Sequence, residues 1–529
     1  MTTVVDHTPN LLDSATPAVA PLPTRYVEQT TRRARRDSRS GAPRVALLVD
    51  HPLRDLPGMV LLARYLTSAG ATAYLVPFNL AEVELPRLVP DLVLLNYYRR
   101  SCLWLYEALA AARIPMAVLD TEGGVLESLD AYTSELVAQP EMRSLVRRYL
   151  CWGPVVARHL VDGGWFDTRQ VTVTGCPRTD YYASPWREAV ARRGDAVSDY
   201  GRNLILLNGN FSLGNPGFVG RDDQHRIMVD SLGHEPAKVR QWQDRECAAL
   251  RELCTLANLI ARRYPQATVV YRPHPFESLA PYHELLQRRA NLHCVRQGSV
   301  EAWLARARVV IQRSCTTAIE AGLAGVPAFS PHWVKPSFER PASDRVSVPF
   351  ASAVELVEAV GSALSGEFSM PDRVQQSLSE VVGDWFYAVD GQSHERVAEA
   401  LLDCATTDDR AERRAACRDL VYRLNEYRSG SPRWIRKRIK AALHLPPNWS
   451  YFRFGAKPLQ PERFDKWDES SKRFTAGDVS VLLSALRGCG MSSGVEGQCE
   501  PAHASGDYSF GYVQGRSVRL GSVRASKAA

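Results

Sequence analysis

The chain has 529 residues, 45% of them apolar, and its 65 Lys and Arg outnumber its 58 Asp and Glu to give a net charge of +7. That composition excludes a wholly disordered protein, and no apolar run is long enough to predict a membrane-spanning helix. The length predicts about three structural units, or two large ones with tails. The N-terminus lacks the pattern of a secretory signal, and the eleven cysteines include no CxxC pair. We therefore expect a cytoplasmic protein with reduced thiols and no structural metal site.

Residues 1–43 are rich in Thr, Pro and Ala and end in an arginine run, which predicts a disordered, Arg-rich arm. Short apolar runs then alternate with stretches of helical spacing. The predicted strands of this first array are 45–49, 72–76, 91–95, 114–119 and 171–174, and its predicted helices are 58–69 and 103–112.

The same alternation restarts after a junction at 184–203. The predicted strands of the second array are 203–207, 268–271, 292–295, 308–312 and 326–329, and its predicted helices are 244–263, 299–307 and 316–324. Two α/β arrays of this kind predict two doubly wound domains, 44–200 and 201–350, each with a parallel sheet. Ligands of such sheets bind beyond the carboxyl ends of the strands, so we expect a cleft between the two domains.

Three regions complete the predicted organisation: helices that close the fold over 351–405, a basic helical module over 406–475, and a largely disordered tail over 476–529. Between Arg410 and Lys440 there are eleven Arg or Lys and only three acids, and Ile435 and Ile439 lie on one face of the predicted helix. This pattern is typical of a helix lying on an anionic membrane surface. A solvated helix packed on the second domain is the alternative; nucleic-acid binding is disfavoured because no recognised fold accompanies the charge.

The first candidate site follows the predicted strand 114–119 and reads Asp120-Thr121-Glu122-Gly123-Gly124. Two carboxylates at the carboxyl end of a strand are suited to act as a general base toward a hydroxyl in the cleft. The alternative is an acid that only caps a helix or a turn.

The second candidate site, Arg272-Pro273-His274-Pro275, also follows a strand. Two prolines fix the backbone and hold His274 in one direction. An imidazole beside Arg272 is suited to hydrogen-bond a phosphate or a leaving oxygen. A rigid turn with an incidental histidine is the alternative.

The third candidate site runs from Gln312 into a predicted helix and contains Ser314, Thr316, Thr317 and Glu320. The start of a helix favours an anion, and the hydroxyls add donors. Glu320 lies one turn further on, where it can accept from two ribose hydroxyls. A capping box formed by Thr317 and Glu320 is the alternative.

Two smaller segments end strands at the same predicted edge. Asn208 and Asn210 follow the first strand of the second array and are suited to contact a phosphate or a sugar, with a plain loop as the alternative. Arg178 and Asp180 follow the last strand of the first array, where they either line the cleft or pair with each other. No P-loop, GxGxxG or GxSxG motif is present, which argues against an NTPase, a dinucleotide oxidoreductase and an α/β-hydrolase.

Together these segments resemble the GT-B glycosyltransferase fold, and most of all the bacterial proteins that build capsule and O-chain carbohydrates. The resemblance covers roughly residues 44–402. The segments that carry it are Asp120-Thr-Glu-Gly, Cys151-Trp-Gly-Pro, Val173-Thr-Gly-Cys-Pro-Arg-Thr-Asp180, Arg272-Pro-His-Pro275, Ser314–Gly322, Trp385-Phe-Tyr-Ala-Val-Asp-Gly391 and Arg396-Val-Ala-Glu399. More distantly the chain is similar to bacterial CMP-sugar transferases, the sialyl- and Kdo-transferases, in which an acidic motif, an HP motif and a Ser/Thr motif occur.

This resemblance implies that Glu122 or Asp120 is the base and that His274 contacts the donor phosphate. Ser314, Thr316 and Thr317 would complete that contact, and Glu320 would hold the ribose. Thr121 separates the two acids here, so the choice of base stays open.

The implied function is metal-independent transfer of a sugar, from a CMP-sugar before other nucleotide-sugars, to a glycan or lipid-linked acceptor at the inner membrane face, with no cofactor. The alternatives are a UDP-sugar 2-epimerase, a CDP-glycerol glycerophosphotransferase, or a non-catalytic GT-B scaffold.

Overall fold

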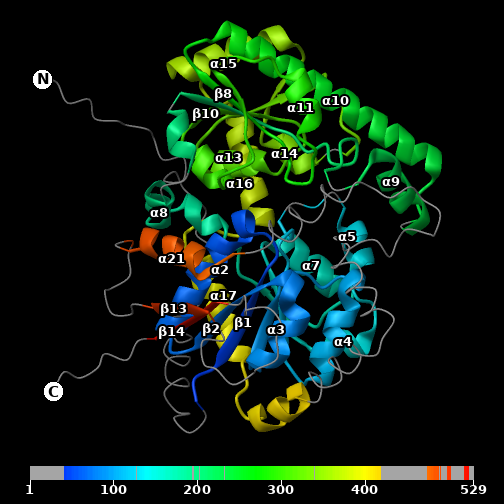
Figure 1. The fold of residues 1–529 in the computed structure, drawn as a ribbon, viewed down its shortest axis with the longest axis vertical. Coiled ribbons are helices and arrows are strands. Elements are labelled where there is room, and N and C mark those ends of the chain that lie inside the picture. The colour runs from blue at the N-terminus through cyan, green and yellow to red at the C-terminus, as the bar shows by residue number, and fades with distance from the viewer. Residues whose placement is uncertain are drawn as a thin grey trace, which may run out of the picture.

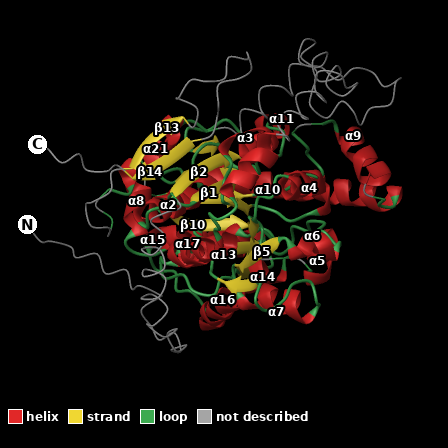
Figure 2. Ribbon diagram, turned by 90° about the horizontal axis from the view of Figure 1, so that it is seen from below, coloured by secondary structure: helices red, strands yellow, loops and turns green. Residues whose placement is uncertain are grey.

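The computed structural model describes residues 41–418 apart from eight single positions (125, 127, 194, 195, 202, 218, 232 and 339), and it describes residues 474–487, 489, 497–501 and 518–522. Two α/β units lie one above the other, the first in blue and cyan and the second in green and yellow (Figure 1). Seen from below, helices lie around the strands (Figure 2).

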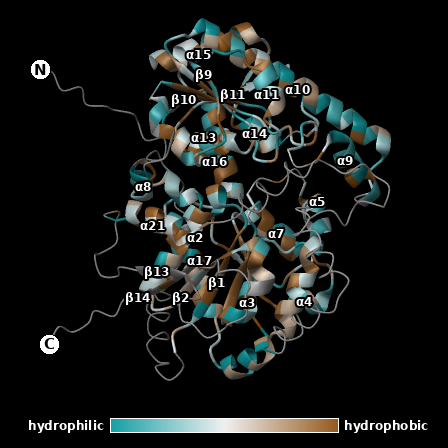
Figure 3. Cartoon of the chain, viewed as in Figure 1, coloured by the Kyte–Doolittle hydropathy of each residue, from teal (hydrophilic) through white to brown (hydrophobic). Residues whose placement is uncertain are grey.

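The first unit is built on a sheet whose order is β13-β14-β2-β1-β3-β4-β5-β6. Its parallel strands are β1 (Arg44–Val49), β2 (Thr72–Pro77), β3 (Leu92–Leu95), β4 (Met116–Leu119), β5 (Val146–Cys151) and β6 (Val171–Val173). Alternate residues of β1 enter two separate apolar clusters, so both faces of this sheet are covered. That double burial explains why its strands are continuous apolar runs, which colour brown in Figure 3.

Helices cover both faces of the first sheet. They are α2 (Pro52–Ser68), α3 (Ala81–Leu88), α4 (Leu103–Ala111), α5 (Leu129–Glu135), α6 (Pro140–Ser144), α7 (Pro154–Asp162) and α8 (Trp186–Arg192). Helix α2 begins six residues before the predicted helix because Pro52 occupies its first position, where a missing N–H costs nothing. Its N-terminus therefore lies at the carboxyl end of β1.

The second unit has a six-stranded parallel sheet in the order β12-β11-β10-β7-β8-β9. Its strands are β7 (Leu204–Asn208), β8 (Thr268–Arg272), β9 (Leu292–Cys294), β10 (Ala307–Gln312), β11 (Ala328–Pro331) and β12 (Val348–Phe350). Its helices are α9 (Arg221–Arg226), α10 (Pro236–Arg263), α11 (Ala280–Leu285), α12 (Val300–Leu304), α13 (Thr317–Leu323), α14 (Pro341–Arg345) and α15 (Ala353–Ser365).

Two helices then carry the chain back to the first unit. Helix α16 (Asp372–Trp385) contacts α13 and α14 of the second unit and α7 of the first, and α17 (Ser393–Cys404) packs on α2 and β5. One apolar cluster continues from the first sheet into the second, so the two units share a core. Two facing Rossmann-like units with this final crossover make the predicted GT-B fold, which is confirmed.

The predicted tail over 476–529 is wrong for the segments that the structure describes. Residues Ala476–Ala485 form helix α21, and β13 (Gly497–Pro501) and β14 (Val518–Ser522) pair antiparallel to each other. Strand β14 also pairs with β2, so this hairpin covers an edge of the first sheet.

Most of the predicted basic module lies outside the described residues. At its described start, Arg410 and Arg413 both form ion pairs with the buried carboxylate of Asp91. These two arginines therefore fasten the chain to the first unit instead of facing a membrane. The helices within the described ranges include none that is long and apolar enough to cross a bilayer.

Candidate active site

Loops that follow the strands of the two sheets come together where the two units meet. An ion pair joins Arg178 of the first unit to Glu320 of the second, with 3.7 Å between Arg178 Nε and Glu320 Oε1. Gly58 in α2 makes the position of Arg178 possible, because a Cβ there would lie 2.8 Å from the backbone nitrogen of Arg178. The helix and the 177–178 segment are thus in direct backbone contact at the cleft.

Asp120 lies beneath the loop that follows β4. It is 1% exposed, and its carboxylate accepts from the Glu122 backbone N–H at 2.9 Å and from the Tyr132 hydroxyl at 3.2 Å. Burial raises the pKa of Asp120 to about 6, against the opposing effect of Arg99. Gly123 is buried as well, and its N–H closes the turn on the Asp120 carbonyl. Asp120 therefore shapes the loop from below.

Glu122 is the acid of this loop that reaches solvent. Its side chain is 49% exposed, and it pairs with Arg99 at 2.7 Å and with Arg54 at 3.7 Å. Arg99 follows β3 and Arg54 lies in the first turn of α2, so three strand-end segments meet at this carboxylate. The two guanidinium groups fix the direction of Glu122 in the cleft.

Arg54 itself is held by a network that the sequence analysis did not find. It pairs with Asp50 and with Asp55, each at 2.9 Å, and Asp55 also accepts from the Thr121 hydroxyl at 2.6 Å. Burial alone would raise the pKa of Asp55, but Arg54 and Thr121 hold that pKa below its ordinary value. The signal available in the sequence was the run of polar residues directly after the first strand, Asp50-His51-Pro-Leu-Arg54-Asp55.

His274 follows β8 in the second unit. Burial, reinforced by the charges of Arg54 and Arg340, lowers its pKa to about 4, while Glu122 acts in the opposite direction. The charges of the first unit thus act on a histidine of the second. His274 Nδ1 accepts from the Phe276 N–H at 3.3 Å, so the neutral ring carries its proton on Nε2. The imidazole is therefore a neutral donor across the physiological pH range.

Arg272 is the charged group nearest to His274 in sequence. Its guanidinium donates to the Gly298 carbonyl at 2.9 Å and lies over the Trp303 ring, while its Nε has no partner in the described structure. Burial lowers the pKa of Arg272 to about 10, so it remains a cation at neutral pH. The predicted combination of a cation and an imidazole at this strand end is therefore present.

The Ser/Thr segment is more buried than the sequence suggests. Ser314 is 3% exposed and its hydroxyl accepts from Arg313 Nη1 at 2.7 Å. Thr316 precedes α13 without a side-chain capping bond, and the buried Thr317 hydroxyl has no partner among the described residues. Glu320 pairs with Arg178, so the capping box considered for Thr317 and Glu320 does not form.

Two further predicted site residues differ in their surroundings. Asn208, at the end of β7, is 4% exposed and neither atom of its amide has a partner within the described structure. Asn210 is partly exposed and its Oδ1 accepts from the Ser212 hydroxyl at 3.2 Å. A buried amide without partners marks a place where a ligand can supply the missing hydrogen bonds.

Asp180 does not line the cleft, which corrects the prediction. It is fully buried and accepts from the N–H groups of Ser393 and His394 at the start of α17. The alternative of a pair between Arg178 and Asp180 is also wrong, because the two side chains bind different partners. Sequence spacing places the two residues together but does not reveal that α17 returns to this point.

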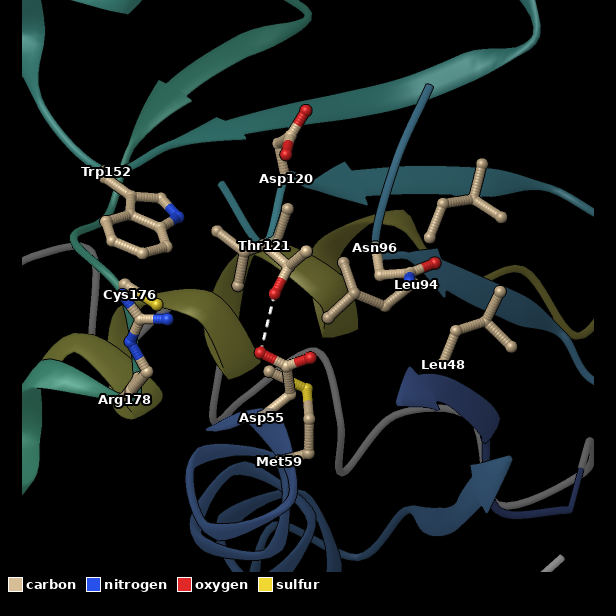
Figure 4. Close-up of a pocket in the computed structure, with 12 residues that line it drawn as sticks. Leu48, Asp55, Met59, Leu94, Asn96, Asp120, Thr121, Trp152, Cys176 and Arg178 are labelled. Carbon is tan, nitrogen blue, oxygen red and sulfur yellow. Dashed lines mark hydrogen bonds between the residues drawn. The ribbon is translucent and has the colours of Figure 1, made fainter. Parts of the chain in front are cut away.

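A small cavity of about 20 Å³ lies beside the loop that follows β4 (Figure 4). Its polar lining comes from Asp55, Asn96, Asp120, Thr121, Trp152 and Arg178. The Asn96 amide and Trp152 Nε1 are buried without partners in the described ranges. A space of this size holds about one water molecule or one oxygen atom of a ligand.

Glu246 on α10 holds the loop that carries Arg340. It is 3% exposed and accepts from the Ser337 N–H at 2.6 Å, and Arg340 in turn donates to the Ser314 carbonyl at 3.2 Å. Burial raises the pKa of Glu246 to about 7, although the bonds from Ser337 oppose the shift.

This shift predicts a pH-dependent stability. The folded protein binds more protons than the unfolded chain between the ordinary pKa of 4.5 and about 7, so the wild type loses stability as pH rises through that window. Glu246→Gln removes the loss, and we expect it to gain about 2–3 kcal/mol relative to wild type between pH 5 and pH 8. Urea unfolding at both pH values measures this, with the exposed Glu252→Gln on the same helix as control. An equal difference at both pH values would contradict the prediction.

No group of three or more His, Cys, Asp or Glu that could hold a metal occurs in the described part of the chain. The groups that the cleft does offer are arginines, an exposed carboxylate and a neutral imidazole. This set can bind a phosphate-bearing ligand and accept a proton from a hydroxyl.

Comparisons with known proteins found similar architectures. No protein-family model and no curated protein matches the chain. Among solved structures, the wall teichoic acid polymerase TagF has a TM-score of 0.43 and 10% identity, covering 73% of this chain and 97% of that one. The UDP-GlcNAc 2-epimerase of Neisseria meningitidis bound to UDP-GlcNAc has a TM-score of 0.40 and 13% identity (68% and 100% covered). The Methanocaldococcus jannaschii UDP-GlcNAc 2-epimerase with UDP-GlcNAc and UDP has a TM-score of 0.40 and 12% identity (64% and 98%). Because these TM-scores are below 0.5, the GT-B assignment rests on the chain's own sheets.

Proposed function

We propose that this chain is a GT-B enzyme that transfers a sugar from a nucleotide-sugar donor to an acceptor hydroxyl in surface-polysaccharide assembly. The observation that carries the proposal is that strand-end segments of the two units meet at the ion pair of Arg178 with Glu320, where Glu122 follows β4 of the first unit and His274 follows β8 of the second. A base and a phosphate-directed donor on opposite domains are what such a transfer needs.

On the donor side, the leaving phosphate gains charge as the bond from its oxygen to the sugar carbon breaks. His274 Nε2–H donates to that oxygen, and Arg272 supplies positive charge from the same loop. The buried amide of Asn208 and the hydroxyl of Thr317 supply further hydrogen bonds, since both lack partners in the described structure. Such donors act without reorganising, and losing one typically lowers the rate by about 10²–10³.

On the acceptor side, Glu122 takes the proton of the acceptor hydroxyl, and the acceptor oxygen forms the new bond to the sugar carbon. Arg99 and Arg54 hold the carboxylate in place. Asp120 is 1% exposed and its oxygens accept from the Glu122 N–H and the Tyr132 hydroxyl, so in this proposal it supports the loop. The role of base, left open between the two acids, is therefore proposed for Glu122.

The proposal includes the finer predictions of a CMP-sugar donor and a lipid-linked acceptor at an anionic membrane. The acid, HP and Ser/Thr segments motivate the donor. The basic stretch between Arg410 and Lys440, apart from the two arginines that bind Asp91, motivates the membrane contact. Glu320 pairs with Arg178 of the first unit, so a ribose bound by Glu320 would contact a residue that also joins the two units.

Calorimetry against a panel of pyrimidine and purine nucleotides tests the proposal. We expect binding, strongest for CMP or another pyrimidine nucleotide, and a loss of about 10-fold or more in affinity for His274→Ala, since one buried donor is removed. His283→Ala on the surface of α11 is the matched control. Because the pKa of His274 is about 4, this residue should add no pH dependence between pH 6 and 8.

Two outcomes would replace the proposal. Binding of none of the nucleotides by the wild type would favour a non-catalytic scaffold. Conversion of a UDP-sugar without acceptor would instead indicate an epimerase, and transfer from CDP-glycerol a glycerophosphotransferase.

A further inference from the structure

Two loops of the proposed donor site are joined through a residue that neither the motifs nor the proposed chemistry uses. One loop follows β7 and runs from Asn208 to Gly217, and the other follows β8 and contains His274. The carboxylate of Glu277 accepts from the Phe211 N–H and from the His274 N–H, both at 3.0 Å, with the same oxygen, Oε1. Glu277 is 1% exposed, so water does not compete for these bonds.

The turn that carries His274 is closed from both sides. The Glu277 N–H donates to the His274 carbonyl at 3.0 Å, while the Glu277 side chain accepts from the His274 N–H. Inside the turn the Phe276 N–H donates to His274 Nδ1. This reciprocal arrangement resembles the bonding of a helix capping box and fixes both the backbone and the ring of His274.

Backbone bonds bring the outer parts of the same two loops together. Gly217 N–H donates to the Phe276 carbonyl at 2.7 Å, and Ser278 N–H donates to the Asn215 carbonyl at 3.1 Å. A Cβ at Gly217 would lie 2.8 Å from the Glu277 carbonyl oxygen, so only glycine permits this approach. The inner parts of the loops, beside the cleft, are joined by the Glu277 carboxylate.

The other carboxylate oxygen of Glu277 is held independently. The hydroxyl of Tyr282, on α11, donates to Oε2, and the Tyr282 ring packs against Tyr271 of β8. Burial raises the pKa of Glu277, and the hydrogen bonds from Tyr282, Phe211 and His274 oppose the cost of burying this acid. One oxygen of this buried acid accepts from an N–H group of each loop. Such an acid is suited to orient the two loops relative to each other.

We propose that Glu277 is a positioning residue that joins the loops after β7 and β8 into one donor-binding surface and sets the direction of the His274 imidazole. The joining of the loops is inferred from the hydrogen bonds alone. The claim that the joined surface binds a donor rests on the proposed function. Glu277 acts through His274 and Phe211 and does not contact the nucleotide.

Amide hydrogen exchange of the full chain tests the joining of the loops without any substrate. In Glu277→Ala we expect peptides from both 208–217 and 273–278 to lose protection together, because the two N–H groups lose their shared acceptor. Glu277→Gln should keep protection, since its amide oxygen can still accept both bonds. Loss in one peptide only, or in neither, would overturn the proposal.

Calorimetry with the nucleotide that the wild type binds tests the effect on the site. We expect Glu277→Ala to weaken binding about 10-fold or more and Glu277→Gln to rescue it to within a few-fold. Tyr282→Phe removes the bond to Oε2 only, so it should lower the melting temperature with a much smaller effect on affinity. The exposed Glu252→Ala is the control for substitution on this unit.

The outcomes separate the two claims. If Tyr282→Phe weakens binding as much as Glu277→Ala, then general destabilisation explains the loss and the positioning role is wrong. If the wild type binds no nucleotide, the proposed function fails, and hydrogen exchange alone decides whether Glu277 joins the loops.

Discussion

Replacing Glu122 by Gln is expected to lower kcat by about 10²–10⁴ while leaving nucleotide affinity close to that of wild type. The amide keeps the size of the side chain and can still accept from Arg99, so the loop should hold its shape. What it loses is the ability to accept the proton of the acceptor hydroxyl. Initial rates of sugar transfer at saturating donor, together with calorimetry of the nucleotide, measure the two effects separately.

A matched control is available on the same arginine. Glu135 also pairs with Arg99, at 3.7 Å, and its side chain is 60% exposed. Glu135→Gln should therefore change kcat by less than a few-fold. Wild-type kcat in Glu122→Gln would show that Glu122 is not the base.

Asp120→Asn separates the two acids of the motif. Asp120 is nearly inaccessible to solvent, and both of its oxygens accept hydrogen bonds. Its substitution should therefore change the rate by altering the loop and by removing a group that titrates near pH 6. We expect the wild-type rate to fall as pH drops below about 6, because protonation removes the charge that receives the Glu122 N–H. pH–rate profiles of both variants measure this. If Asp120→Asn abolished turnover while Glu122→Gln stayed active, the base would be Asp120.

The sheets were predictable where burial on both faces forces a continuous apolar run. The runs at 45–49 and 268–271 are strands β1 and β8 almost to the residue. Strand β5 was missed because Arg147 and Arg148 interrupt its apolar pattern, whereas β12 was missed although β6 and β9, which are equally short, were predicted. Pattern reasoning therefore succeeds where the apolar run is uninterrupted and fails where charged residues break it.

The site was predictable as a set of strand ends, but the partners of its residues were not. The motifs placed Glu122 and His274 at facing edges because the carboxyl ends of parallel strands share one edge. Their functional roles stay predictions. Which of the 65 Lys and Arg approach the site depends on contacts between residues far apart in the sequence, such as Arg54 and Glu122, whose numbers differ by 68. The ion pair of Arg178 with Glu320 joins two units and leaves no trace in local spacing.

The second large effect concerns Asp180, whose predicted place in the cleft the structure corrects. Its carboxylate accepts the Ser393 N–H at 3.0 Å, the His394 N–H at 2.8 Å and His394 Nδ1 at 2.8 Å. The rings of Tyr65 and Trp186 enclose His394 edge-on, so no water replaces these bonds. Asp180 thus fastens the start of α17, the helix that returns to the first unit after the crossover.

Asp180→Ala is expected to destabilise the protein by about 3–5 kcal/mol, because three buried donors lose one shared acceptor, each costing about 1–3 kcal/mol with incomplete additivity. Asp180→Asn should cost less, since one amide oxygen still accepts at the start of the helix. Urea unfolding measures both, with the exposed Asp167→Ala as control. A loss below about 1 kcal/mol in Asp180→Ala would mean that α17 is held by its apolar face on α2 alone. The predicted loss would instead mean that a single carboxylate anchors α17, and with it the shared core of the two units. Because Asp180 lies in the same segment after β6 as Arg178, this anchor and the ion pair of Arg178 with Glu320 depend on one short stretch of chain.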